Sequence, residues 1–156
     1  MLGFFNSDPI DDPALGMLTR HGKWWVGTLS LPRFGAVELR VAGGRRGPDP
    51  RSVDRAVALP RVVGARESEI SAAFYEHYLP GLEVSQSGDF VTLSEFPILE
   101  DANGVWPHVR VERVEVDAAQ KEYTVEIACV VTWDEEHTLG LRLDGDRVVE
   151  LCGSIL

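Results

Sequence analysis

The strongest constraint on the fold is a strict alternation of apolar side chains over residues 121–133. Every second position is apolar: Tyr123, Val125, Ile127, Cys129, Val131 and Trp133. A period of two indicates a β-strand with one buried face. The opposite face begins polar and becomes apolar at Ala128 and Val130. Because a strand covered on both faces belongs inside a sheet, we expect this strand to be central.

Shorter alternating segments predict further strands. Residues 23–31 and 36–42 flank a Pro-Arg-Phe-Gly turn, and together they predict an antiparallel hairpin. In residues 105–117 the apolar positions change from odd to even at Glu112 and Arg113. That change of phase predicts a β-bulge or a strong bend.

An Asp-Gly pair predicts a second hairpin near the C-terminus. We expect a three-residue loop at residues 144–146. This loop would place Leu141 opposite Val149 and Leu139 opposite Leu151, so that apolar side chains share one face.

Helical signals are confined to residues 51–79. Ser52 is a suitable N-cap residue for a first helix, and Pro60 should end or kink that helix. A second helix should begin near Glu67, whose carboxylate suits the positive end of the helix dipole. Pro80 and the following glycine should stop it.

These elements predict an α+β fold in a single domain spanning residues 1–156. A mostly antiparallel sheet would combine the N-terminal hairpin with a C-terminal meander, and the helices of residues 51–79 would pack on one face. Residues 1–21 are expected to be irregular. Residues 89–93 are expected to form a short strand.

The charge distribution favours a cationic partner. The chain has 15 basic and 25 acidic residues, and residues 95–156 hold 5 basic against 14 acidic ones. An acidic surface repels phosphate backbones, so we expect no nucleic-acid partner. Residues 33–66 carry 8 arginines, but these are too dispersed to form a dense basic patch.

The remaining composition predicts a cytoplasmic protein with no membrane partner. Cys129 and Cys152 are too few for a disulfide framework and suit a reducing compartment. No apolar stretch approaches the roughly 20 residues that a membrane helix needs. Residues 1–9 lack the basic start and apolar run of a signal peptide. The oligomeric state stays open.

A charged cluster between two expected strands is the candidate functional site. The candidate binding residues are Trp133, Asp134, Glu135, Glu136, His137 and Gly140. Three carboxylates and one imidazole within four residues are unusual for a simple strand reversal. The simplest interpretation is a polar turn with the tryptophan in the core.

Two chemical hypotheses compete with a binding role. Asp134, Glu136 and His137 offer donors that suit a metal ion, but further histidines would have to converge from distant parts of the chain. Alternatively, His137 or Glu136 would act as a general base with Asp134 as its orienting group, although no matching nucleophile is evident. The alternative to binding is therefore a hydrolase or metal-binding protein that uses these three residues.

The binding interpretation is preferred. His137 shares the phase of Leu139, so its ring should be partly buried and held by a neighbouring carboxylate. Gly140 would permit a close backbone approach or a bend. We expect a non-catalytic protein that binds a cationic protein partner, and we assign no catalytic residue, metal or cofactor.

The cluster resembles the W-D-x-E-H-x-L-G signature of a family of small, uncharacterised bacterial domains. Here the signature runs from Trp133 to Gly140, with His137 followed by Thr138 where the family usually has glycine. The N-terminal half is similar too, in Trp25-x-Gly27 before the first hairpin. The resemblance implies a cytoplasmic α+β domain of undetermined activity. It also implies a role like that of toxin-neutralising immunity proteins, with a toxin as the cationic partner.

Overall fold

The computed structural model describes residues 7–87 and 96–153. Within these residues, two α-helices and one 3-10 helix accompany nine strands of a mostly antiparallel sheet. The α+β prediction is therefore confirmed. The short strand expected at residues 89–93 lies outside the described residues.

The sheet follows the predicted order of a hairpin and a meander. Its strands are β1 (Ile10–Asp12), β2 (Gly16–His21), β3 (Trp24–Leu31), β4 (Gly35–Gly44), β5 (Gly47–Pro48), β6 (Val109–Val116), β7 (Val125–Val131), β8 (Asp134–Asp144) and β9 (Arg147–Gly153). They are ordered β1-β2-β3-β4-β6-β7-β8-β9, and β5 pairs with β4. The central position predicted for β7 is confirmed, because β6 and β8 flank it.

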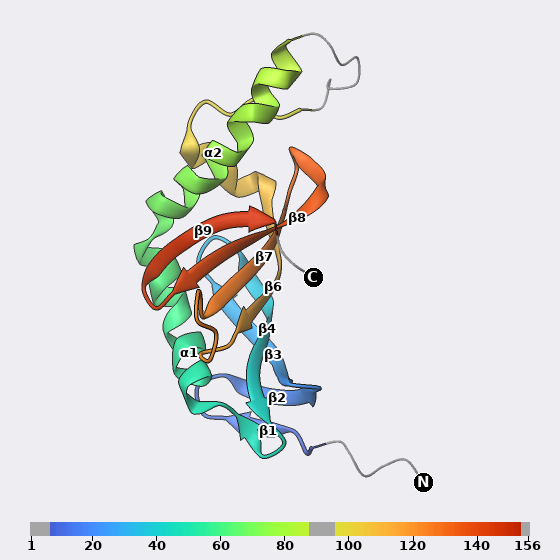
Figure 1. The fold of residues 1–156 in the computed structure, drawn as a ribbon, viewed down its shortest axis with the longest axis vertical. Helices are drawn as coiled ribbons and strands as arrows, with labels where there is room; N and C mark the ends of the chain where they lie inside the picture. Colours follow the sequence, from blue (N-terminus) through green and yellow to red (C-terminus); the bar gives the residue numbers. More distant parts are fainter. Residues whose placement is uncertain (1–6, 88–95, 154–156) are drawn as a thin grey trace.

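The helical segment joins the two halves of the sheet. It consists of α1 (Pro50–Ala65), α2 (Glu67–Gln86) and the 3-10 helix η1 (Ala102–His108). The connection returns the chain beside β4, so β4 and β6 pair in parallel. Figure 1 shows α1 and α2 following one another along one side of the sheet.

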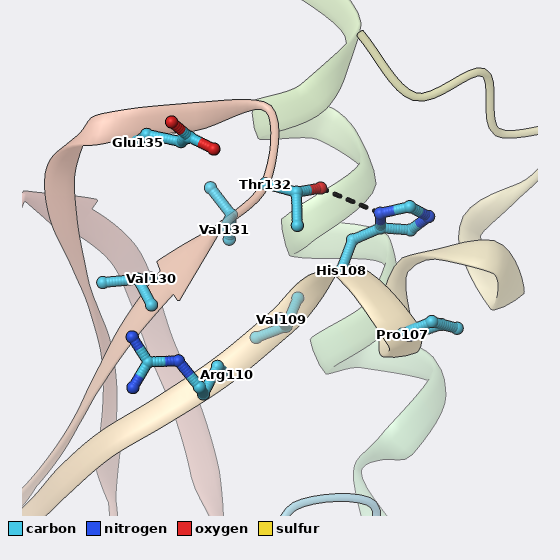
Figure 2. A pocket seen from close by; sticks show the side chains of 8 residues that line it. All are labelled: Pro107, His108, Val109, Arg110, Val130, Val131, Thr132 and Glu135. Carbon is cyan, nitrogen blue, oxygen red and sulfur yellow. Dashed lines mark hydrogen bonds between the residues drawn. The ribbon is translucent and has the colours of Figure 1, made fainter. Parts of the chain in front are cut away.

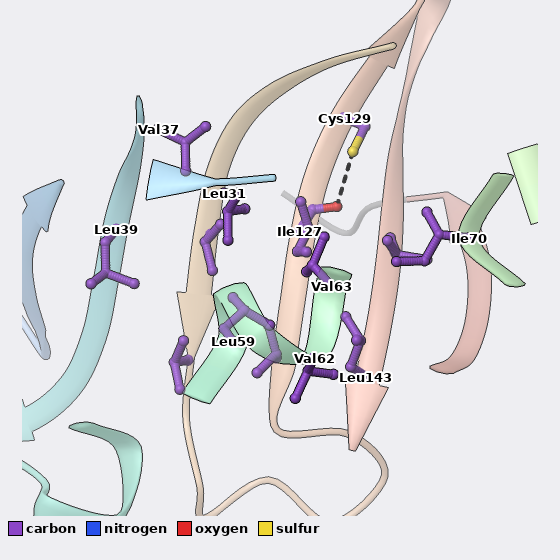
Figure 3. Close-up of a cluster of buried hydrophobic side chains, with 14 of the residues drawn as sticks. Leu31, Val37, Leu39, Leu59, Val62, Val63, Ile70, Ile127, Cys129 and Leu143 are labelled. Carbon is purple, nitrogen blue, oxygen red and sulfur yellow. Dashed lines mark hydrogen bonds between the residues drawn. The ribbon is translucent and has the colours of Figure 1, made fainter. Parts of the chain in front are cut away.

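The core lies between these helices and the sheet. Both halves of the sheet contribute to it, with Leu39 from β4 and Ile127 from β7 fully buried. Figure 3 shows these side chains around Leu59 and Val63 of α1. Cys129 also faces this core, and burial raises the pKa of its thiol. The alternation along β7 therefore correctly identified its buried face.

Residues 1–21 are not irregular throughout, which corrects the sequence-based expectation. Strands β1 and β2 form a hairpin there. Its turn is stabilised by Asp12, whose Oδ1 accepts hydrogen bonds from the backbone N–H groups of Ala14 and Leu15 at 2.9 Å. Leu18 of β2 is fully buried. A single buried side chain in a short strand leaves too little alternation for sequence analysis to detect.

The first helix begins and ends differently from the prediction. Asp49, not Ser52, is the N-cap residue, and it accepts hydrogen bonds from the backbone N–H and hydroxyl of Ser52 at 3.1 and 3.0 Å. The helix also continues through Pro60 to Ala65. Leu59 and Val63, on either side of the proline, are buried. Because burying each such side chain stabilises the fold by about 1.5–3 kcal/mol, packing offsets the proline's unfavourable effect.

The second helix continues past residue 79, where it was expected to stop. It contains Pro80 and ends at Gln86. The chain beyond it returns to the turn before the proline: Phe96 stacks on Tyr78, with ring centroids 5.5 Å apart. The Tyr78 hydroxyl also donates to the backbone oxygen of Pro97 at 2.7 Å. After the proline, Phe96 lies beside Gly81 and Leu82 packs against the core, so tertiary contacts accompany the helix on both sides of Pro80.

Two predicted irregularities of the sheet have different outcomes. The bulge in β6 is confirmed by a register shift between Val111 and Arg113. The predicted loop between β8 and β9 is wrong, because Asp144 pairs with Arg147 across a two-residue turn. A second register shift leaves Val149 without a partner, so Leu141 pairs with Leu151. This bulge restores the buried phase that the longer loop was expected to provide.

Candidate functional site

The charged cluster forms a projection at the end of the sheet, which we call the corner (residues 132–138). Val131 pairs with Asp134 across a two-residue turn, and the next pair is Cys129 with Leu139. Four residues of β8 therefore stand opposite the single residue Val130 of β7. In Figure 1, this first part of β8 rises beyond the end of β7 and lies near α2.

Trp133 anchors the corner on α2. Its ring is half-buried and meets Tyr78 edge-on, with centroids 5.4 Å apart. Its indole N–H donates a hydrogen bond to Nδ1 of His77 at 3.0 Å. The simple interpretation of Trp133 as a core residue is therefore half correct, because its polar edge contacts a second titratable side chain.

His77 is the site residue that sequence analysis did not select. Since its Nδ1 accepts from Trp133, the neutral ring carries its proton on Nε2. Burial lowers the pKa of His77, the charge of Asp134 opposes this shift, and His137 adds to it. His77 lies 56 positions before Trp133. No local spacing signals a contact over that separation.

Asp134 and His137 form the predicted carboxylate–imidazole pair. The distance from Asp134 Oδ1 to His137 Nδ1 is 2.8 Å. This hydrogen bond, with the carboxylate's charge, raises the pKa of His137. However, the His137 side chain is 68% exposed, so the expectation of partial burial is wrong. The four-residue excursion takes His137 out of the ladder that Leu139 joins.

Glu135 and Glu136 are both exposed. Glu135 stands at the edge of a hollow of about 450 Å³ whose lining includes Val109, Val130 and the corner residue Thr132. Figure 2 shows Glu135 on the strand above the hollow, and His108 bonded to Thr132. Asp134, Glu136 and His137 do not line this hollow. The corner's charged groups therefore do not converge on one cavity.

Gly140 has a structural role. A Cβ atom at this position would lie 2.9 Å from Oε2 of Glu126, so glycine permits the close approach that was predicted. Glu126 is itself buried, and its Oε2 accepts from Nε of Arg142 at 2.9 Å. Arg142 also donates to Glu150 at 2.9 Å. Gly140 thus makes room for an ion pair on the sheet face opposite the core.

In the described parts of the chain, no three His, Cys, Asp or Glu side chains are arranged to hold a metal ion. None of the helices among residues 7–87 and 96–153 is long and apolar enough to cross a membrane.

Comparison with known proteins confirms that the chain contains an uncharacterised domain, as the resemblance implied. Residues 62–154 match the family described as a domain of unknown function, DUF6985. This range contains α2, β6 to β9 and the whole corner. Neither curated proteins nor solved structures gave a match. Because the match covers more than half of the chain, the protein belongs to the DUF6985 family.

Proposed function

We propose that this protein is a non-catalytic binding module that captures a cationic protein through its acidic C-terminal half. The observation that carries the proposal is the form of the corner. Glu135 and Glu136 are exposed on a projection, while Trp133 anchors the projection to α2. A pair of exposed carboxylates on an anchored projection suits contact with basic side chains.

The geometry favours binding over chemistry at these residues. A hydrolase would gather Asp134, Glu136 and His137 around a concave pocket that holds its substrate. Here His137 is bonded to Asp134 and is mostly exposed, and Glu136 lies on the surface. The acids are presented outward, as a binding surface requires.

The charge around the corner extends this acidic surface. Helix α2, on which the corner rests, has four glutamates and no lysine or arginine. Residues 95–156 add 14 acidic residues against 5 basic ones. Such a field accelerates association with basic proteins, and the acceleration falls as salt rises.

The resemblance described above suggests which partner to test first. Immunity proteins neutralise toxins by binding them, so a basic bacterial toxin in the cytoplasm is the proposed partner class. This role requires recognition and no turnover, in agreement with an outward-facing corner. The class of partner rests on the resemblance, whereas the location of the contact rests on the exposed acids.

Capture from a lysate of the source cells tests the proposal. The baits are the wild type, the corner variant Glu135→Gln/Glu136→Gln, and Glu122→Gln as a control at an exposed acid outside the corner. We expect a basic protein that the wild type and control retain at about 50 mM salt and the corner variant loses. Equal retention by the corner variant, or retention at about 500 mM salt, would contradict the proposal.

A further inference from the structure

A groove runs between α2 and the edge strand β9. Its volume is about 530 Å³. Strand β9 ends the sheet order, so only β8 pairs with it among the described residues. The β9 side supplies Val148, Val149 and Leu151, and Val149 is 37% exposed. The floor of the groove is therefore partly aliphatic and open to solvent.

Acidic side chains line the helix wall of this groove. Glu69 and Glu76 belong to α2, and no lining residue is lysine or arginine. Seven helical residues rise about 10.5 Å, so Glu69 and Glu76 lie on one face two turns apart. The helix wall thus presents carboxylates at separated points along the groove.

The neighbouring cations do not neutralise these acids. Arg66 lies 3.6 Å from Glu69 and 4.0 Å from Asp146, so two carboxylates share one guanidinium group. Glu150 does not add to this charge, because it bonds Arg142 at 2.9 Å on the sheet face opposite the core.

Glu76, in the middle of the helix wall, has no ion pair within the described residues. Glu69, Glu76 and Asp146 therefore stand against the single guanidinium group of Arg66, which gives a net charge of −2 on this side of the groove. Arg147, at the start of β9, is already paired with Asp144 at 3.8 Å.

We propose that this groove receives a lysine- or arginine-bearing segment of the cationic partner. The inference rests on the proposed function and specifies where the partner's basic segment lies. The valine and leucine floor accepts the aliphatic stems of the basic side chains, while the glutamates bind their charged ends.

The groove adjoins the corner, because His77 lines the groove and accepts the hydrogen bond from Trp133. Recognition is by side chains and not by strand addition. The unpaired Val149 interrupts the regular spacing of β9, and such bulges oppose edge-to-edge pairing. The partner's segment therefore needs basic side chains above an apolar surface, without a continuous backbone ladder.

The test uses a fluorescein-labelled decapeptide of alternating lysine and valine, with an alternating glutamate–valine peptide as its control. Binding is followed by fluorescence anisotropy at about 20 and 300 mM salt. The full chain is compared with the groove variant Glu69→Gln/Glu76→Gln. Glu83→Gln is the matched control, because Glu83 is an exposed acid of the same helix outside the groove. Circular dichroism verifies that each variant is folded.

We expect the lysine peptide to bind only at low salt and the groove variant to weaken binding about fivefold. Glu83→Gln should change the affinity less than about twofold. Equal binding by the groove variant and the Glu83 control would overturn the groove assignment. Absence of lysine-peptide binding to the wild type, or equal binding of the glutamate peptide, would overturn it as well.

The corner variant Glu135→Gln/Glu136→Gln separates the two proposals. If it alone weakens peptide binding, the corner proposal stands and the groove assignment is wrong. A second outcome is that the groove variant alone weakens peptide binding and that lysate capture does not depend on the corner. In that case the corner is not the contact site, and the groove assignment stands. Sedimentation measurements test whether a second copy of the chain occupies the groove. A salt-dependent dimer that Glu76→Gln abolishes would assign the groove to self-association and overturn the partner segment.

Discussion

Gly140 lies where the side chain of Glu126 crosses β8, so even one added methyl group should displace a buried carboxylate. A Cβ atom there would lie 2.9 Å from Oε2 and 3.0 Å from Cδ of Glu126, whereas ordinary contacts begin at 3.4 Å. The carboxylate would have to move by about 0.5 Å to restore normal contact. That movement lengthens its 2.9 Å hydrogen bond to Nε of Arg142.

The expected cost of Gly140→Ala follows from this geometry. Forcing an extra methyl group into a packed site typically costs about 1–3 kcal/mol. Complete loss of one partner of a buried ion pair costs about 3–5 kcal/mol, which sets the upper limit here because Arg142 retains Glu150. We therefore expect the free energy of unfolding to fall by about 1–3 kcal/mol and Tm to fall by about 2–10 °C.

A double-mutant cycle identifies the cause of the loss. Unfolding in urea, followed by tryptophan fluorescence, gives the free energies for Gly140→Ala, Glu126→Ala and the double variant. Removing the Glu126 side chain removes the atoms that collide with the methyl group. The alanine should then be neutral or stabilising by up to about 1 kcal/mol, since glycine weakens strands. The two changes should be coupled by at least about 1 kcal/mol.

Gly153→Ala is the matched control. Gly153 lies on the neighbouring strand β9, and among the described residues no atom outside its chain neighbours stands within 4 Å of the position that its Cβ would occupy. This substitution should leave the free energy of unfolding almost unchanged. Equal losses for the two glycines, or strictly additive costs in the cycle, would refute the account of Gly140.

Four further predictions concern the corner, its anchor on α2 and the first helix. Trp133→Phe removes the indole donor to His77 and should cost about 0.5–1.5 kcal/mol in urea unfolding; no loss would contradict the anchoring role. Because the folded-state pKa of His77 is lowered, its contribution to stability is present above the ordinary histidine pKa and declines as pH falls through the folded value. His77→Gln, which cannot titrate, should reduce the decline between about pH 7 and 5 by less than 1 kcal/mol, and an unchanged slope would refute this. The raised pKa of His137 acts oppositely, since its contribution is present below the ordinary histidine pKa and declines as pH rises through the folded value. Flattening of the slope above the ordinary histidine pKa in His137→Gln would verify the sign, and an unchanged slope would refute it. Asp49→Ala removes the acceptor for the backbone N–H of Ser52 and should lower the free energy of unfolding by about 0.5–2 kcal/mol, whereas no change would contradict the capping assignment.

Sequence analysis located most of the sheet because the buried faces of its strands alternate strongly. It also found the bulge in β6, where the apolar phase changes before Arg113. It expected the first helix to end or kink at Pro60 and the second to stop at Pro80, whereas both helices continue past these residues. A proline's local cost is known in advance, but the compensating tertiary contacts are not. The predicted loop length of the hairpin after β8 was wrong for a related reason. Register can be restored by a bulge as well as by a longer loop, and Val149 carries no local signal of that choice.

The local contact within the candidate site could be predicted from the sequence, whereas its exposure and its long-range contact could not. The pairing of Asp134 with His137 involves residues three apart, so it could be anticipated. The exposure of His137 could not, because alternation predicts orientation only while a strand stays in its ladder. His77 contacts Trp133 across 56 positions, and only the packing of α2 on the sheet determines that contact.

The residues of the signature that this sequence resembles have different physical roles. Trp133 fixes the corner to α2 and the Asp134–His137 bond stiffens it, while Gly140 admits the side chain of Glu126. The unspecified position between the aspartate and the second acid is Glu135, which is exposed beside a hollow. A position that carries no scaffold contact can change without loss of the fold. If family members bind different partners through this corner, we therefore expect the choice of partner to depend on this position more than on the residues that build the corner.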